Sequence, residues 1–298
     1  MPDRISVVLI FLNEERFLAE AVASVYAQTY RKWELLLADD GSTDGSTELA
    51  RDYARQDPAR VRYLEHPGHA NKGASAVRNL GVSAATGEWI AFLDGDDVWL
   101  PTRLERGVAL AREHPQADMV YGRTEYWHSW QGEGARYPDR VQSHFFSADR
   151  LAQAPDLLIA YLSLRAAYPC MGSLLVRRQA YLEVGGFEES FTELCTDLVF
   201  LGKFCLTYDV YVSNECWDRY RQHAGSSTAI AGSAGRMQSA NLRYLRWLHS
   251  YIAAGGTANP LLERALQGAI RRTELGPHAW QNRIGRAVRR LTRRAMGY

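Results

Sequence analysis

Three carboxylates stand close together in the segment IAFLDGDDVWLP, where an apolar run is followed by Asp94, Asp96 and Asp97. The run at 89–93 predicts a strand that is buried on both faces and ends at the acids. Carboxylates this close repel one another, so the cluster requires a cation, a solvated turn or a chemical role. In an extended segment the side chains of Asp94 and Asp96 would point the same way, as ligands of one divalent cation.

The coordination chemistry of such a cation indicates which small molecule would bind with it. Mg²⁺ and Mn²⁺ take one or two carboxylates from a protein and complete their shell with water and phosphate oxygens. A metal at this cluster therefore implies a phosphorylated ligand. The segment FLNEERFL after the first apolar run has neither a Walker loop nor a G-x-G-x-x-G pattern, which argues against a P-loop and a dinucleotide site.

Short apolar runs alternate with helical patterns in the first part of the chain. Strands are predicted at 5–12, 33–38, 61–64 and 89–93, with Asn13 capping the first helix and Pro101 in the first turn of the fourth. Beyond a short run at 119–121 the pattern loosens into a long connection. The alternation predicts an α/β fold with a mostly parallel sheet.

Polar residues gather after the strands of this predicted sheet. Asn13 follows the first strand, Asp39 and Asp40 follow the second, and the acids of DGDD follow the fourth. Each group alone is also typical of a turn or a helix cap. Their common position at the carboxyl edge of a parallel sheet, where ligands bind, favours a ligand site.

Composition excludes several other classes of protein. The 298 residues carry a formal charge of +1, which gives no case for nucleic-acid binding. The four cysteines lie at no zinc-ligand spacing and are expected to be free thiols in a reducing compartment. No apolar run has the length of a signal peptide or a spanning helix, so the sequence predicts a cytoplasmic protein without membrane spans.

Several ordered motifs resemble the family-2 glycosyltransferases, which have the GT-A fold. The resemblance covers about 5–227 and is carried by LLLADDGSTDGS, NKGASAVRNLGVSAATGEWIAFLDGDDVWLP, GGFEESFTELCTDLVFL and CWDRYRQHAGSS. It implies a Rossmann-like, mostly parallel mixed sheet flanked by helices. The expected catalytic domain, 1–227, comprises a nucleotide-sugar-binding half (1–122) and an acceptor-binding half (123–227), followed by a helical region at 228–298.

The resemblance also implies roles for residues that would bind the donor. Asp40 would hydrogen-bond the nucleotide base with support from Asp39, and Asn13 would lie beside them. Asp94 would face the ribose and the metal, and Asp96 would bind the Mn²⁺ or Mg²⁺ that bridges the two phosphates of a D-x-D site.

Three cationic or imidazole groups are implied near the diphosphate. Arg78 would lie near the donor sugar or the phosphates, with a helix-surface arginine as its alternative. Arg221 and His223, in RYRQH, would approach the diphosphate.

The catalytic base is implied in FTELCTDLVFL, where the family usually has Glu-Asp at the start of a helix and this chain has Thr196 and Asp197. Asp197 is the predicted base, with a plain helix-terminus carboxylate as its alternative. Glu193 is the second candidate for the base. Such a carboxylate would take the proton of an acceptor hydroxyl that attacks the anomeric carbon.

The implied activity is that of an inverting hexosyltransferase of polysaccharide biosynthesis. It would move a sugar from a nucleotide-diphosphate donor, UDP-linked, to a glycan, a lipid-linked saccharide or another hydroxyl acceptor. The residues at 10–12 differ from the Pro-Thr-Tyr of many relatives, which leaves uracil, thymine and guanine open. A non-catalytic binding protein of the same fold is one alternative, because Thr196 replaces the usual Glu; a sugar nucleotidyltransferase, which needs a Gly-rich loop, is another.

The carboxyl-terminal segment has a separate pattern. On a helix its apolar residues form one stripe and six arginines occupy the rest: Trp280, Ile284, Val288, Leu291 and Ala295 against Arg283, Arg286, Arg289, Arg290, Arg293 and Arg294. The pattern is typical of a helix on an anionic membrane surface, which would place the protein at the inner membrane face. A helix that packs on protein fits equally well.

Overall fold

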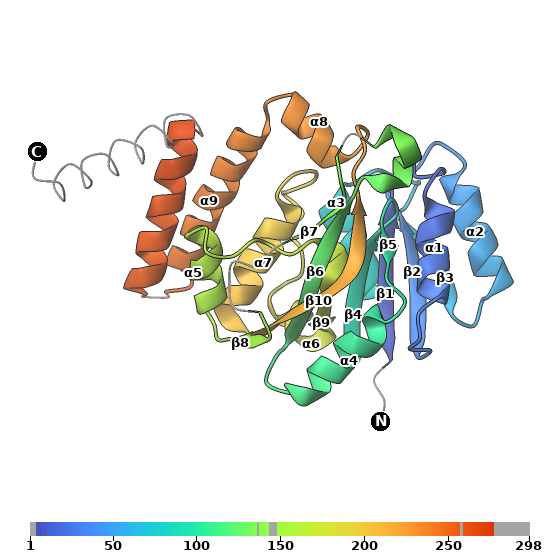
Figure 1. Cartoon of the computed structure of the whole chain (residues 1–298), viewed down its shortest axis with the longest axis horizontal. Coiled ribbons are helices and arrows are strands. Elements are labelled where there is room, and N and C mark those ends of the chain that lie inside the picture. The colour runs from blue at the N-terminus through green and yellow to red at the C-terminus, as the bar shows by residue number, and fades with distance from the viewer. Residues whose placement is uncertain (1–3, 136, 143–147, 257–258, 277–298) are drawn as a thin grey trace, which may run out of the picture.

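A central mixed sheet with helices on both faces makes up most of the molecule (Figure 1). This computed structural model describes residues 4–135, 137–142, 148–256 and 259–276. The sheet has ten strands, in the order β3-β2-β1-β4-β9-β6-β10-β5, with β7 paired to β6 and β8 paired to β10. The predicted α/β fold, with a mixed sheet flanked by helices, is therefore confirmed.

The amino-terminal half of the sheet is parallel. Its strands are β1 (Ile5–Phe11), β2 (Trp33–Asp39), β3 (Val61–Glu65) and β4 (Trp89–Asp94). β1 lies between β2 and β4, and every residue of β1 and β2 is buried. Burial on both faces explains why these strands have continuous apolar sequences.

The second half of the sheet contains the antiparallel pairs. β9 (Leu174–Arg177) runs antiparallel to β4 and β6 (Met119–Trp127), whereas β10 (Val210–Arg221) is parallel to β6 and antiparallel to β5 (Val98–Trp99). The short strands are β7 (Arg140–Val141) and β8 (Arg150–Ala152). β6 runs well past the predicted 119–121 because β10, distant in sequence, continues to pair with it as far as Trp127.

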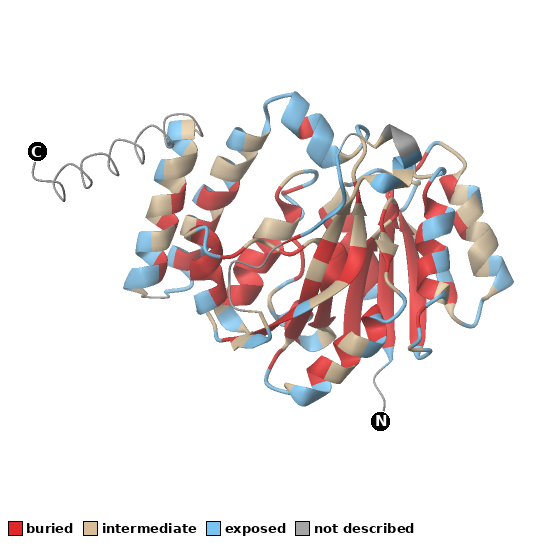
Figure 2. Ribbon diagram, viewed as in Figure 1, coloured by how far each residue is buried: buried red, intermediate tan, exposed pale blue. Residues whose placement is uncertain are grey.

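Two hydrophobic clusters lie on opposite faces of the sheet, and strand residues alternate between them. Figure 2 shows that most residues of the strands are buried. One face is covered by α1 (Leu18–Tyr26), α2 (Ser46–Gln56) and α4 (Arg103–Glu113). The other is covered by α3 (Ala74–Ser83), α5 (Asp156–Leu162), α6 (Arg178–Glu183) and α7 (Thr196–Thr207). Two 3₁₀ turns, η1 (Ser129–Gly134) and η2 (Met171–Ser173), complete the irregular region. The two clusters therefore bury the sheet on both faces.

Three helices follow the sheet in the described part of the chain, and the second and third of them share its core. They are α8 (Ser227–Ser233), α9 (Met237–Ala254) and a helix at 260–276. Leu248 of α9 is fully buried in the cluster that contains α7, and Leu266 of the last helix joins it. The helical region is thus confirmed, while the boundary at 227 stays a prediction.

Three further sequence predictions concern the carboxyl-terminal segment, membrane-spanning helices and the cysteines. The predicted basic stripe at 280–295 lies outside the described residues. Within the described ranges, no helix combines the length and apolar character that crossing a membrane requires. The four cysteines are free thiols, as predicted, and Trp217 is a core residue with 1% of its surface exposed.

Candidate active site

The ends of three parallel strands bring the predicted polar groups together. In the register of the sheet, Phe11 of β1 pairs with Asp39 of β2, and Ile10 pairs with Asp94 of β4. Two backbone hydrogen bonds extend the pairing beyond the strands, from Asp40 N to Phe11 O and from Gly95 N to Ile10 O. The loops after β1, β2 and β4 therefore form one continuous edge, as predicted.

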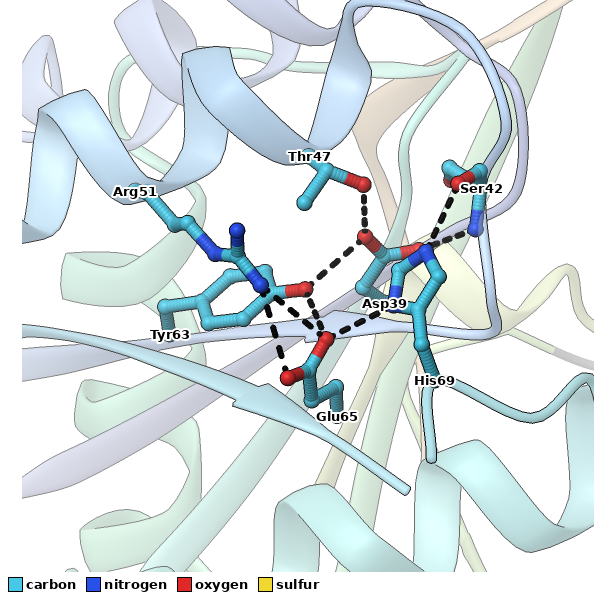
Figure 3. A network of polar contacts seen from close by, with 7 residues as sticks. All are labelled: Asp39, Ser42, Thr47, Arg51, Tyr63, Glu65 and His69. Carbon is cyan, nitrogen blue, oxygen red and sulfur yellow. Dashed lines mark hydrogen bonds and ion pairs between the residues drawn. The ribbon is translucent and has the colours of Figure 1, made fainter. Parts of the chain in front are cut away.

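Asp39 is held inside this edge by three donors (Figure 3). Its Oδ1 accepts from Ser42 N at 2.8 Å, and its Oδ2 accepts from Thr47 Oγ1 at 2.6 Å and Tyr63 Oη at 3.1 Å. The residue is fully buried. These contacts suit the supporting role predicted for Asp39.

Asp40 connects the loop after β2 to the loop before α3. Its carboxylate accepts from Lys72 N at 2.8 Å and from Gly73 N at 3.0 Å. Burial raises the pKa of Asp40, although the two backbone donors oppose the shift. The loops touch at Gly41, whose φ is +84° and whose added Cβ would lie 2.8 Å from Asn71 N. A residue with a side chain could not stand at that position without moving the loops apart.

Asn13 is not the helix cap predicted from the sequence. Its φ is +57°, and α1 begins only at Leu18, after a turn that starts at Glu14. Instead Asn13 Oδ1 accepts from Thr43 N at 2.7 Å, and its own N–H donates to Ser42 Oγ at 3.0 Å. Asn13 therefore ties the end of β1 to the loop after β2.

The acids of DGDD lie in a turn, which corrects the expectation of an extended segment. β4 ends at Asp94, and Gly95 and Asp96 turn away. Asp94 Oδ1 accepts from Arg78 Nη2 at 2.7 Å, whereas Asp96 Oδ2 lies 3.0 Å from His223 Nε2. The turn forms because Gly95 packs against β1: an added Cβ would lie 2.8 Å from Phe11 Cβ.

The donor set of this turn fits a hard divalent cation. Over the described residues, no three His, Cys, Asp or Glu side chains are grouped as metal ligands. Two carboxylates are nevertheless what Mg²⁺ or Mn²⁺ needs when a diphosphate and water supply the other oxygens. Asp94 Oδ2 and Asp96 Oδ1 have no hydrogen-bond partner in the described part of the chain, so each acid can offer one oxygen.

Glu14 is a carboxylate of this site that the sequence reasoning missed. An added Cβ on Gly95 would lie 3.4 Å from Glu14 Cβ, so Glu14 stands over the turn. Burial raises its pKa to about 8, with further contributions from Asp96 and Asp94. The available signal was its position directly after Asn13, at the same sheet edge.

Asp97 faces the protein interior. It is 3% exposed, and its Oδ1 accepts from Arg221 N at 2.9 Å. Burial, with Asp96 and Asp94 nearby, raises its pKa well above the ordinary value. Asp97 thereby fastens the turn to β10.

The Arg221 guanidinium supports the same turn. It donates to Asp96 O at 2.7 Å and to Glu20 Oε2 at 2.6 Å. It also lies over the rings of Phe17 and Trp127, 4.6 and 4.4 Å from their centroids, and is 2% exposed. With these partners Arg221 positions Asp96, and its predicted approach to the diphosphate stays a prediction.

Arg78 joins the turn at 94–97 to the start of α7. It is 5% exposed, which rules out the alternative of a surface arginine. Its Nη2 donates to Asp94, and its Nη1 donates to Thr196 Oγ1 at 3.2 Å. Thr196 thus serves as an acceptor for Arg78 at the position where the family usually has Glu.

Asp197 lies in the first turn of α7 and is half-buried. Burial raises its pKa, while the Leu198 N–H and Arg78 act against that shift and Asp94 adds to it. Arg78 and Asp94 are therefore near enough to act on Asp197 electrostatically. Glu193 has 64% of its side chain exposed and is paired with Arg236 at 3.0 Å, which suits a surface carboxylate better than a base.

The mixed sheet and its acidic edge have the GT-A architecture that the sequence predicted. Residues 6–167 match the family model described as glycosyl transferase family 2, and the chain belongs to that family. Glycosyltransferase GlyG of Streptococcus pneumoniae serotype 4 (strain ATCC BAA-334 / TIGR4) is 37% identical over 138 residues, which are 46% of this chain and 44% of GlyG. The chain spans less than half the length of the curated relatives it matches.

Solved structures share the fold at low sequence identity. S. aureus TarS 1-349, in complex with UDP-GlcNAc, has a TM-score of 0.68 and 18% identity over 91% of this chain and 72% of that one. Mannosyltransferase PcManGT from Pyrobaculum calidifontis, in complex with GDP-Man and Mn²⁺, has a TM-score of 0.62 and 16% identity over 98% and 81%. Both confirm the architecture.

Proposed function

We propose that this protein is a metal-dependent, inverting hexosyltransferase that uses a nucleotide-diphosphate sugar, UDP-linked, to glycosylate a glycan, a lipid-linked saccharide or another hydroxyl acceptor. One observation carries the proposal. Asp40, Asp94 and Asp96 occupy one sheet edge, and Arg78 links that edge to Thr196, the residue before Asp197 at the start of α7. The reaction needs an acid that binds the nucleobase, a pair of acids that bind a metal, and a carboxylate that takes the acceptor proton.

The acids of the sheet edge have different roles in donor binding. Asp40 hydrogen-bonds the nucleobase, and Asp39 and Asn13 fix the loop around Asp40. Asp94 and Asp96 would hold Mn²⁺ or Mg²⁺, which would supply positive charge against the negative charge of the departing diphosphate. Arg78 and His223 keep the two carboxylates in place beside the donor.

Sugar transfer is then a single displacement. The acceptor oxygen forms a bond to the anomeric carbon as the bond from that carbon to the diphosphate oxygen breaks. The proton of the acceptor hydroxyl passes to Asp197, and the nucleoside diphosphate leaves with the electron pair. The raised pKa of Asp197 suits a group that must accept a proton near neutral pH.

The comparisons support the donor class. TarS is described in complex with UDP-GlcNAc, and PcManGT with GDP-Man and Mn²⁺. Both donors are nucleotide-diphosphate sugars, and they differ in base and in sugar. A panel of donors is therefore the proper test.

The experiment measures binding and nucleotide release with UDP-, GDP-, dTDP-, CDP- and ADP-linked sugars, with and without Mn²⁺. We expect Mn²⁺-dependent binding of a UDP-linked sugar and slow release of UDP, which an acceptor mixture accelerates. Absence of binding by every donor would contradict the proposal. Binding with no release under any condition would favour a non-catalytic binding protein, the alternative that Thr196 suggests.

A further inference from the structure

His69 joins the loop after β2 to the segment between β3 and α3 (Figure 3). Its Nδ1 lies 2.6 Å from Glu65 Oε2, and its Nε2 lies 2.7 Å from the carbonyl oxygen of Ser42. Ser42 belongs to the loop after β2, and His69 begins the segment that leads to α3. One side chain therefore spans both loops.

Both partners of the ring are hydrogen-bond acceptors. A carbonyl oxygen has no hydrogen to give, and Tyr63 Oη, which donates to Glu65 at 2.7 Å, is the largest influence that lowers the pKa of Glu65 and keeps it ionised. A neutral imidazole has one N–H and can satisfy only one of the two acceptors. Both contacts are made together only when His69 is an imidazolium.

The charges around His69 favour that form. Glu65 of β3 and Asp39 of β2 are acidic neighbours of His69. Arg51 of α2 is the opposing positive charge, and its Nη2 lies 3.3 Å from Glu65 Oε2. Tyr63 Oη lies within hydrogen-bond distance of both carboxylates and has one hydrogen to share between them. It stays neutral, because burial and Glu65 raise its pKa. The sum favours the cation: the Ser42 carbonyl, followed by Glu65, raises the pKa of His69.

The clasped loops are the ones that hold Asp40. Lys72 N and Gly73 N, three and four residues beyond His69, donate to the Asp40 carboxylate. An added Cβ on Gly41 would lie 2.8 Å from His69 O, so the loops are in close contact beside the clasp. Any loosening of the His69 contacts changes the position of the donors to Asp40.

We propose that protonated His69 is a positioning residue for nucleotide binding, clasping the 39–42 loop to the 69–73 loop and so holding Asp40 toward the base of the donor. The inference rests on the proposed function, because it assigns Asp40 to the base. The sign of its pH dependence follows from the chemistry. The clasp is complete at low pH and loses one contact as pH rises through the pKa of His69, so donor affinity falls as pH rises.

The test measures the affinity of the full chain for the same panel of nucleotide sugars with Mn²⁺ between pH 6 and pH 8.5. The diphosphate of these donors is a diester and does not titrate in this range. For the wild type we expect affinity to weaken on the order of fivefold across the range, the size of one hydrogen bond. His69→Gln should be weaker by a similar factor at pH 6 and should lose this part of the pH dependence.

Two further variants sharpen the test. Glu65→Gln removes the carboxylate that favours the cation, so the loss of affinity should move to lower pH. His249→Gln is the matched control, because His249 of α9 also faces a carboxylate, Glu263 of the helix at 260–276, at 3.7 Å. It should retain the wild-type profile. The effect should appear in KM, with kcat unchanged.

The outcomes separate the two ideas. Donor binding by the wild type, with the same affinity and pH profile in His69→Gln, would overturn the clasp and leave the proposed function standing. A wild type that binds no donor in the panel would overturn both. A melting temperature measured for each variant shows whether the fold is intact, since a variant that merely unfolds would lose affinity at every pH.

Discussion

The carboxylates of the donor edge and the carboxylate of Asp197 have different surroundings. On the donor edge, which comprises Asp39, Asp40, Asp94 and Asp96, every carboxylate contacts at least one nitrogen or hydroxyl group from a neighbouring segment. Asp197 sits at the start of a helix, where the Leu198 N–H holds it and no described side chain donates to it. The carboxylates of the donor edge are held in position before a ligand binds, whereas the carboxylate of Asp197 is left available to accept a proton.

The difference matches what binding and proton transfer require. Groups that bind a base or a cation gain from being held in position before the ligand arrives, because less order is lost on binding. A general base needs an oxygen that is not already engaged by strong donors, and a pKa closer to the working pH. The comparison therefore predicts that substitutions on the donor edge affect affinity and that substitution of Asp197 affects turnover.

Asp197→Asn should produce the largest effect. The amide cannot take the acceptor proton, so we expect turnover to fall by about 10²–10⁴-fold. Donor affinity should stay within about threefold of the wild type, since Asn has almost the same shape. Nucleotide release in the presence of an acceptor mixture measures the loss. Glu193→Gln is the control, and an equal loss there would move the base to Glu193.

Asp96→Asn should produce the next largest effect, on metal-dependent affinity. Removing a carboxylate charge from the proposed cation site should weaken donor binding in Mn²⁺ by at least about 10- to 100-fold, which is the typical cost of losing only a hydrogen-bond partner of a metal ligand. Titration of the donor with and without Mn²⁺ checks the result. Asp52→Asn, which changes an exposed acid paired with Arg55, should bind like the wild type. Undiminished Mn²⁺ dependence in Asp96→Asn would place the cation elsewhere.

Thr196→Val should produce a smaller effect at the connection between the two regions. The substitution keeps the side-chain shape and removes the acceptor of Arg78 Nη1. Loss of one buried hydrogen bond, about 1 kcal/mol, corresponds to about a fivefold fall in kcat/KM. Thr196→Ser restores the hydroxyl and should recover the rate. A rate in Thr196→Val equal to that of the wild type would show that Arg78 does not need this contact.

Asp218→Asn tests whether a raised pKa by itself marks function. Asp218 is fully buried beside Thr124, and burial raises its pKa to about 7. Between pH 5 and pH 7 the folded protein keeps this proton while the unfolded chain has lost it, so wild-type stability falls as pH rises.

The asparagine variant should lack that fall. From pH 5 to pH 7 the free energy of unfolding of Asp218→Asn should rise by about 2 kcal/mol relative to that of the wild type. Denaturant unfolding at the two pH values measures it. Turnover should change little, and a loss as large as that of Asp197→Asn would remove the distinction between the two acids.

The sheet edge could be predicted because its determinants are local. Apolar runs mark β1, β2 and β4, and strands that run in parallel must end at one edge, so Asp39, Asp40 and Asp94 fall together. The same logic failed where a distant segment decides the local structure. Asn13 adopts a left-handed conformation because Thr43 and Ser42 bind it, which local helix-cap rules do not contain.

The DGDD segment shows the same limit. Its spacing suggested two acids on one side of a strand, but packing of Gly95 on Phe11 turns the chain and sends Asp96 toward His223. The partners of Arg221 were also hidden, because Glu20 is about 200 positions away in sequence and no pattern links them. Contacts between residues this far apart in sequence can be read only from the folded structure and not from a local sequence pattern.

The stereochemistry of transfer tests the central claim most directly. A single displacement with Asp197 as base requires the acceptor to attack from the face opposite the diphosphate, so an α-linked donor must give a β-linked product. Proton NMR of the product formed with an accepted donor and acceptor, recorded before any anomeric exchange, reads the configuration. We predict inversion, and a product with the α configuration of the donor would contradict the account.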